Sequence, residues 1–385
     1  MVKIQPASHR KEKVLRAEEC CEIAVDAVAR HITLPINGSL KPRTIIQSLV
    51  GMSTNNLSIH SITHIVERIP CETSVRYHLS KLDLESLQTV QSKILSYSQN
   101  TILKPGKSYH FAVDFTNDPY YGTIVESNHD YVIKSRQKES TTTFYSYISL
   151  SIITTGHRLT LAVFPVKCGV QKTEYLKRFL AIIRDLDLHI TILCLDRGFY
   201  SHDVFAFLQT ENVPHIVPVR NYGKVLGRVL TGNRARYAQY IMQGTGNPIG
   251  LNLAIDVHYL KGKNSKAGNV NLGYVVHGIS WNPRRVYNVY KKRFAIESSY
   301  RMRNIVKAKT SSKSVTFRYL LTIISFLLKN VWVALQRVYF SLPQRGPISV
   351  NEDLFRFDLF RILIWDVIRN TLKIVALFPG RHRLP

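Results

Sequence analysis

The chain has 385 residues, of which 45% are hydrophobic, so it can bury the cores of about two to three domains and is not a disordered sequence. It carries 52 Lys and Arg residues against 26 Asp and Glu residues, a formal net charge of +26. No fold requires such an excess, which indicates a polyanionic partner, with nucleic acid first and an anionic membrane surface second.

Secretion and membrane insertion are not expected from the apolar segments of the chain. Residues 1–13 contain no apolar stretch like that of a signal peptide. The most apolar segment, residues 318–335, has only ten residues between Arg318 and Lys329, whereas a membrane span needs about 20. We expect this segment to be a buried core helix. The five cysteines show no zinc-ligand spacing and indicate reduced thiols in a cytoplasmic protein.

Residues 1–105 are predicted to be helical. Within them, residues 58–82 resemble a helix-turn-helix interrupted by a proline. Its second helix would carry Arg76, His78 and Lys81 into a DNA groove. An ordinary helical hairpin explains the same pattern equally well.

Residues 106–220 change to a strand-rich pattern. Segments rich in β-branched and aromatic residues come first, and helices then alternate with strands; the strand-like segments are 109–116, 142–154, 158–166, 189–196 and 214–220. This order predicts a mixed α/β sheet covered by helices.

Residues 221–282 interrupt that alternation and are rich in glycine, asparagine and basic residues. We interpret them as a β-rich insertion, after which residues 283–340 return to the core and residues 341–385 form a helical tail. Trp281, at the end of the insertion, is a candidate for stacking on a DNA base. Packing within a small β domain is an equal alternative for such an aromatic side chain.

Two aspartates stand on or at the end of predicted core strands. Asp114 lies in FAVDFT and Asp196 ends ITILCLD, and strand ends are where α/β sheets build their sites. Either residue could instead form a turn or cap a helix. Asp118, Asp203 and Asp256 are explained without metal, by a turn, a helix cap and a local ion pair.

A single carboxylate stands in the middle of the basic segment 290–304, which is predicted to be one helix. At about 100° per residue, Tyr290, Arg293, Glu297 and Arg301 fall on one stripe of that helix. One explanation is a surface row of i,i+4 ion pairs. The other is that Glu297 binds a metal ion while its neighbours bind phosphates.

Asp114, Asp196 and Glu297 together favour the metal explanation. Mg²⁺ takes oxygen ligands, including one or two carboxylates, and three carboxylates suit two Mg²⁺ or Mn²⁺ ions about 3.5–4 Å apart. The residues expected to hold the DNA backbone beside such ions are Tyr290, Arg293 and Arg301.

The segments AVDFTNDPYYG, CLDRGFYSHDVF and YKKRFAIESSYR surround these three acids. In this order they resemble the Asp-Asp-Glu transposases of prokaryotic insertion sequences, which implies a ribonuclease H-like core. The third segment is similar to the Tyr-x2-Arg-x3-Glu-x6-Lys signature of the branch that cuts DNA through hairpin intermediates, with Asn304 at the Lys position. A β-rich insertion before the glutamate is a feature of the same branch.

The resemblance implies a function and a set of partners. The protein would bind the terminal inverted repeats of its element and the target DNA, and would cut and transfer strands with two Mg²⁺ or Mn²⁺ ions. It would act as a homodimer or larger assembly in the cytoplasm, on the nucleoid. Two alternatives are a transposase-derived DNA-binding protein that no longer cuts, and a structure-selective DNA nuclease.

Overall fold

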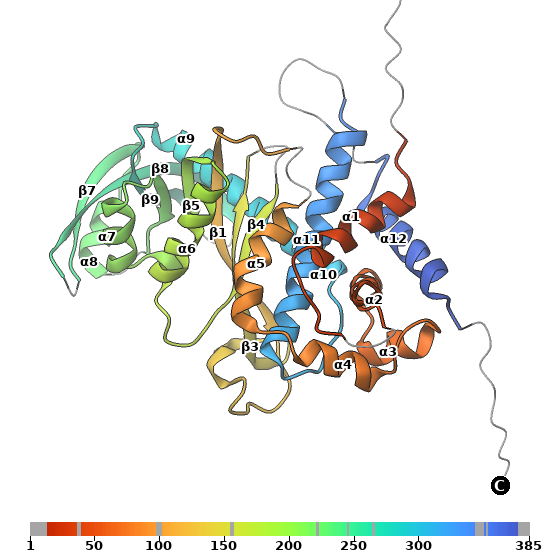
Figure 1. Ribbon diagram of the computed structural model, residues 1–385. Coiled ribbons are helices and arrows are strands. Elements are labelled where there is room, and N and C mark those ends of the chain that lie inside the picture. The colour runs from red at the N-terminus through yellow and green to blue at the C-terminus, as the bar shows by residue number, and fades with distance from the viewer. Residues whose placement is uncertain are drawn as a thin grey trace, which may run out of the picture.

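The computed structural model describes residues 14–36, 40–97, 102–154, 158–220, 223–244, 246–263, 266–342, 350–351 and 353–375. Figure 1 shows a mixed sheet on one side of the molecule and a lobe of helices on the other, with the long helix α11 between them. The predicted class, a mixed α/β sheet flanked by helices, is confirmed.

The helices of the N-terminal region are α1 (Ala17–Ala29), α2 (Pro42–Thr54), α3 (Ile59–Ile65), α4 (Glu72–Ser80) and α5 (Leu84–Ser96). Two of them, α3 and α5, begin at polar caps, because the first backbone N–H groups of a helix lack partners within it. Ser58 accepts a hydrogen bond from the backbone N–H of Ser61, and Asp83 accepts one from that of Ser86.

The core sheet begins with β1 (Ser108–Pro119), β2 (Val132–Lys138), β3 (Thr141–Ile152) and β4 (Thr160–Pro165), and continues with β5 (His189–Leu195) and β6 (His215–Pro218). β1 pairs antiparallel with β3 and parallel with β5, and β5 pairs parallel with β6. The helices α6 (Lys172–Asp185), α7 (His202–Thr210) and α8 (Gly223–Val229) accompany these strands. Strand-forming residues on β1 and β3, such as Phe111, Val113 and Ile148, are fully buried in the sheet's core.

The strands after residue 221 extend the core sheet. They are β7 (Arg236–Met242), β8 (Ile249–Lys263) and β9 (Lys266–His277), and β9 pairs antiparallel with β6 through His215 and His277. Across the described residues the sheet order is β2-β3-β1-β5-β6-β9-β8-β7, with β4 on β3. The predicted insertion is therefore β-rich and continues the core sheet.

After the sheet come α9 (Pro283–Lys291), a 3₁₀ turn (Lys292–Phe294), α10 (Ala295–Ile305), α11 (Val315–Tyr339) and α12 (Phe357–Leu372). α11 is the one described helix that is long and apolar enough to cross a membrane, but 89% of its most apolar window is buried inside the protein. This agrees with the predicted core helix. Two of its polar side chains bond the neighbouring strand β4. Asn330 bonds both backbone groups of Thr160, and Tyr319 donates to the carbonyl of Val163.

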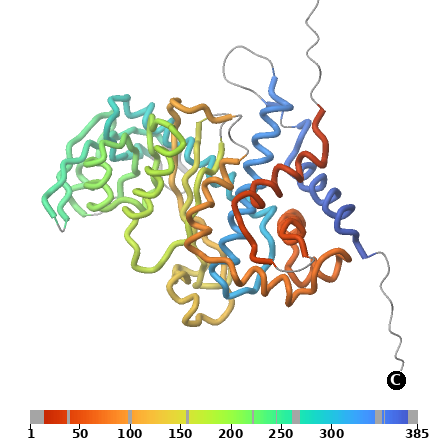
Figure 2. Tube along the Cα trace, viewed as in Figure 1, coloured from red at the N-terminus to blue at the C-terminus, as the bar shows by residue number. Residues whose placement is uncertain are grey.

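The N-terminal and C-terminal segments form one helical lobe around α11. Figure 2 shows the red N-terminal helices beside the blue C-terminal helix, and buried side chains of α1, α2, α11 and α12 belong to one apolar core. Backbone hydrogen bonds from Glu67 and Arg68 to Lys373 and Leu372 close this lobe. The predicted C-terminal tail thus completes the core of the N-terminal region.

Candidate active site

Asp114 and Asp196 lie side by side because of strand register. Val113 on β1 pairs in the parallel direction with Leu195, the last residue of β5. Asp114, the next residue of β1, therefore lies beside Asp196, which directly follows β5. Asp196 then caps the 3₁₀ turn Arg197–Phe199, accepting a hydrogen bond of 2.9 Å from the backbone N–H of Gly198. The sequence analysis placed Asp114 on the first core strand and Asp196 at the end of a later strand, and both lie at these places. Their role as metal ligands stays a prediction.

The environment of Asp114 disfavours its negative charge. Burial raises the pKa of the Asp114 carboxyl to about 6; Arg293 opposes the rise, and the neighbouring Asp196 adds to it. Two carboxylates held together at a half-buried position need a positive partner. Asp114 has one in Arg293, whose Nη1 donates to its Oδ2 at 2.7 Å.

Arg293 and Tyr290 face the acid and not the solvent. Arg293 is 8% exposed and Tyr290 6% exposed, and the Nε of Arg293 donates to the Tyr290 hydroxyl at 3.0 Å. The sequence had suggested that both side chains hold DNA phosphates. In this structure the guanidinium is instead the counterion of Asp114.

The predicted continuous helix over 290–304 is wrong, because the 3₁₀ turn Lys292–Phe294 separates α9 from α10. The turn changes the angular phase, and the stripe predicted at about 100° per residue does not persist across it. Glu297 and Arg301 are exposed on α10. Tyr300 faces the site instead, and its hydroxyl donates to the backbone carbonyl of Asp114 at 3.1 Å.

Glu297 lies on the same helix as Tyr300. It stands one turn before Tyr300, and residues three apart on a helix are neighbours on its surface. Among the described residues, no three or more His, Cys, Asp or Glu side chains are grouped closely enough to hold a metal ion. The structure therefore brings Asp114 and Asp196 together and leaves the exposed Glu297 outside the pair.

The two aspartates fit a divalent cation by their chemistry. Their oxygens are the hard ligands that Mg²⁺ and Mn²⁺ prefer. The two negative charges also repel each other, and a cation between them would offset this repulsion. Arg293 now supplies that charge at Asp114. A cation there would need Arg293 to withdraw, and a third carboxylate would need Glu297 to turn inward.

Lys172 is a residue near the site that sequence reasoning missed. From the first turn of α6, its Nζ donates to the backbone carbonyl of Gly198, in the turn that follows Asp196. Burial lowers the pKa of the Lys172 ammonium, Arg220 lowers it further, and Asp196 opposes the change. A helix lysine lies far from Asp196 in the sequence, so only the fold reveals this contact.

Asp118 is part of a buried ion cluster and not of a turn, as the sequence had suggested. It lies on β1, where Arg303 donates to both of its carboxylate oxygens at 2.9 Å and Lys307 lies 2.8 Å away. Burial alone would raise the pKa of Asp118, but Arg303 and Lys307 lower it to about 2. Strand alternation contained the signal, since Asp118 falls on the same face of β1 as Asp114.

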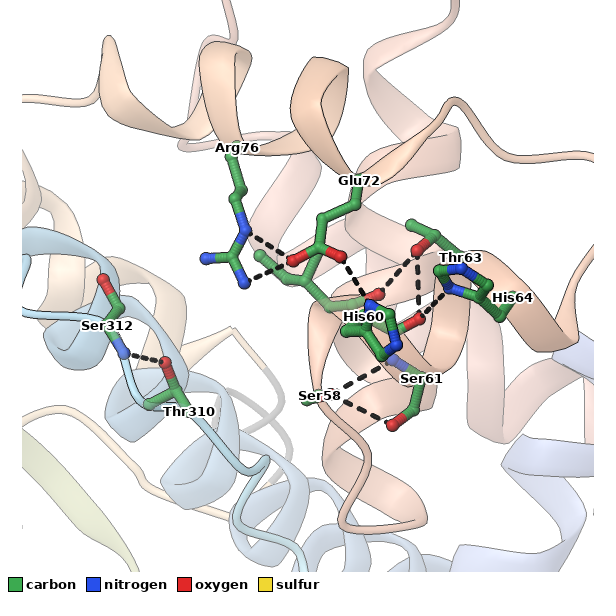
Figure 3. A network of polar contacts seen from close by, with 10 residues as sticks. Ser58, His60, Ser61, Thr63, His64, Glu72, Arg76, Thr310 and Ser312 are labelled. Carbon is green, nitrogen blue, oxygen red and sulfur yellow. Dashed lines mark hydrogen bonds and ion pairs between the residues drawn. The ribbon is translucent and has the colours of Figure 1, made fainter.

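The predicted helix-turn-helix segment contains α3 and α4, shown with their polar network in Figure 3. Glu72 joins the two helices, accepting from Arg76 at 2.8 Å and lying 2.8 Å from the His60 ring. Arg76 and Lys81 are exposed, and the Lys81 ammonium lies 4.1 Å from the centroid of the exposed Tyr77 ring. His78 is only 9% exposed and belongs to the core side of α4.

Trp281 lies about halfway between buried and exposed at the start of the segment leading into α9. The Arg285 guanidinium stacks on its indole at 4.6 Å, and Tyr237 of β7 donates to its backbone carbonyl at 2.5 Å. The side chain thus lies at the junction of the extended sheet and α9. Its suggested role as a base-stacking residue stays a prediction.

Neighbouring aspartates on a mixed sheet are suited to hold divalent ions for phosphoryl transfer, the chemistry by which enzymes cleave nucleic acids. Residues 105–327 match the transposase DDE domain, and the chain belongs to that family. It is a DNA transposase. Members of this family generally use divalent metal ions.

One solved structure with the same fold is a piggyBac transposase synaptic complex with hairpin DNA. It is 12% identical in sequence, with a TM-score of 0.54, and the match covers 96% of this chain and 84% of that chain. No curated protein sequence matches the chain.

Proposed function

We propose that the protein binds the ends of a mobile element, cuts them with Mg²⁺ or Mn²⁺, and transfers the strands to target DNA. Asp114, Asp196 and Glu297 are the proposed metal ligands and catalytic residues. The observation that supports this most strongly is the register of β1 and β5, which places Asp114 beside Asp196. Two neighbouring carboxylates repel each other, and such pairs with a perturbed pKa are concentrated at functional sites.

The residues of the site supply positioning and charge. A bound pair of divalent ions would activate the attacking hydroxyl and stabilise the leaving oxygen. The Tyr300 hydroxyl, bonded to the Asp114 carbonyl and 2.8 Å from Ser149, fixes α10 against β1. When Arg293 leaves Asp114 it carries its charge toward the DNA backbone, where a guanidinium binds phosphate through two parallel bonds.

Arg76 of α4 and Lys81, which directly follows α4, are the proposed contacts to the terminal repeats. Trp281 and Arg301 are proposed to contact the DNA nearer the site of cleavage. The exposure of Arg76, Lys81 and Arg301 supports these roles. Glu72 restrains Arg76 through ion-pair contacts of 2.8 and 2.6 Å, so less side-chain freedom is lost when Arg76 binds DNA.

We further propose that the element is a prokaryotic insertion sequence of the hairpin-type branch, and that the protein acts as a homodimer or larger assembly on the nucleoid, in the cytoplasm. The signature residues Tyr290, Arg293 and Glu297 support the branch, and Asn304 at its Lys position is exposed. The piggyBac structure that shares this fold is of a synaptic complex with hairpin DNA, which supports the hairpin-type part of the proposal.

The test replaces each acid separately with alanine and measures nicking of a plasmid carrying the terminal repeats, with Mg²⁺ and with Mn²⁺. Each variant should lose cleavage and strand transfer and should still shift the repeat DNA in a gel. Cleavage by Asp196→Ala at the wild-type rate would show that the site is wrongly assigned. Loss of cleavage in wild type too, with repeat binding intact, would favour a DNA-binding protein that no longer cuts. Equal cleavage of branched DNA without repeats would favour a structure-selective nuclease.

A further inference from the structure

A buried carboxylate lies away from the acid pair, on β8. Asp256 is 3% exposed, and its Oδ2 lies 2.7 Å from Nε2 of His258 and 3.2 Å from Nη1 of Arg284. A buried carboxylate is costly unless such partners satisfy it. The contact ties the extended part of the sheet to the first turn of α9, and Figure 1 shows α9 beside β8.

One edge of the Arg284 guanidinium is bound to Asp256, and the other edge is exposed to solvent. Its side chain is 59% exposed although Nη1 is bound to Asp256. The guanidinium carbon also lies 5.5 Å from the centroid of the Tyr287 ring, which restrains its plane. Within the part of the chain that the structure describes, Asp256 is the only carboxylate paired with Arg284. The outer N–H groups therefore face solvent in a restrained geometry that suits a second anion.

The guanidinium of the next residue, Arg285, is also restrained, in this case by an aromatic ring. Arg285 is exposed, and its guanidinium stacks at 4.6 Å on Trp281. No described carboxylate forms an ion pair with it. Two adjacent guanidinium groups are thus held in place, one by a carboxylate and one by an indole, where two free surface arginines would repel each other and move apart.

The position of the two arginines relates them to the acid pair. On α9, Tyr290 lies six residues after Arg284, and it contacts Arg293 and through it Asp114. Six residues of helix span about 9 Å. One strand of B-DNA carries a phosphate about every 3.4 Å along its axis, so Arg284 stands about three nucleotides from Tyr290 along such a strand.

We propose that Arg284 and Arg285 form a binding site for backbone phosphates of the DNA strand that enters the acid site, with Asp256 as the positioning residue for Arg284. The ligand class is the phosphodiester backbone and no base is read. The proposal rests on the proposed function, because it requires that DNA lie along α9 beside Asp114.

The experiment measures the affinity of the full chain for a fluorescent repeat duplex at several NaCl concentrations, without divalent ions. Each neutralised phosphate contact contributes about 0.9 to the slope of log affinity against log salt. Arg284→Ala and Arg285→Ala should each lower that slope by about 0.9 and the low-salt affinity by about tenfold or more. Arg284→Lys should restore the slope, because it restores the charge.

Two further variants test whether Asp256 positions Arg284 and whether the loss of any surface arginine would have the same effect. Asp256→Asn should keep the slope, since Arg284 keeps its charge, but should weaken affinity severalfold because the guanidinium is released. Arg184 lies exposed on α6 and forms an ion pair with Glu211. The control variant Arg184→Ala should leave the salt slope and the low-salt affinity unchanged. Thermal unfolding of each variant identifies any loss of folding, and Arg285→Ala tests the site even if Asp256→Asn does not fold.

Wild-type slopes in both Arg284→Ala and Arg285→Ala would overturn the proposal and make the cluster an internal ion pair only. Because binding is measured without divalent ions, this result is independent of cleavage. A wild-type protein that fails to cut, with reduced slopes in the arginine variants, would refute the catalytic function and leave the phosphate site standing.

Discussion

Replacing Arg303 should destabilise the protein far more than replacing its exposed neighbour Arg301. Arg303 is 0% exposed and donates to both oxygens of Asp118, to Ser325 at 3.1 Å and to Thr322 at 3.2 Å. Removing one member of a buried ion pair costs about 3–5 kcal/mol, because the other charge stays buried without its partner.

The structure also predicts which member of the Arg303–Asp118 pair costs more stability when it is replaced. After Arg303→Met, Asp118 keeps Lys307 at 2.8 Å, so the loss should lie at the lower end, about 3 kcal/mol. Asp118→Asn leaves both cations without a carboxylate and should lie at the upper end, about 5 kcal/mol. Arg301→Met should stay within about 0.5 kcal/mol of wild type.

Urea unfolding followed by circular dichroism measures these differences, and thermal unfolding provides a second readout. At about 2–4 °C per kcal/mol for domains of this order of size, Arg303→Met should unfold roughly 6–12 °C below wild type. If Arg303→Met and Arg301→Met unfolded at the same urea concentration, the burial of the Asp118 pair and the orientation of α10 derived from it would both be incorrect.

Three other predictions follow from contacts described above. Because the pKa of Asp118 is lowered to about 2 from an ordinary 3.8, its stabilisation is complete above about pH 4 and is lost as the pH falls toward 2; urea unfolding from pH 5 to 2 should show that loss in wild type and not in Asp118→Asn. Arg76→Ala combined with Lys81→Ala should remove preference for the terminal repeat in gel shifts and leave salt-sensitive binding; unchanged preference would move recognition elsewhere. Arg293→Gln should bind Mn²⁺ more tightly than wild type in calorimetry without DNA, because Asp114 loses its present counterion, whereas Arg301→Gln should not; weaker binding by Arg293→Gln would contradict this.

Much of the sheet could be predicted because its signals are local. The segments rich in β-branched residues became β1, β3, β4, β5 and β6, and each predicted range lies within a few residues of the observed strand. β2 was missed, since its exposed polar residues Lys134, Ser135 and Arg136 lack the alternation on which such predictions depend.

Only the part of the site that depends on strand pairing, the two aspartates, could be predicted from the sequence. Asp114 and Asp196 each end an apolar run, and parallel pairing then places them together. The predicted orientation of Glu297 assumed one unbroken helix over 290–304. No sequence signal such as Pro or Gly marks the turn that interrupts this helix. Tertiary contacts of Arg293 with Asp114 and of Arg303 with Asp118 fix the two helical pieces separately, and those contacts join residues about 180 positions apart.

The closure of the N-terminal lobe by α12 has a consequence for the order of folding during synthesis. The ribosome releases α1 and α2 first, but their apolar faces pack on α11 and α12, which emerge last. β1, β3 and β5 can pair long before that point, because their partners are close in the chain. The helical lobe that carries α3 and α4 is therefore made first and completed last, so a nascent chain can assemble its acid pair before this lobe is stable.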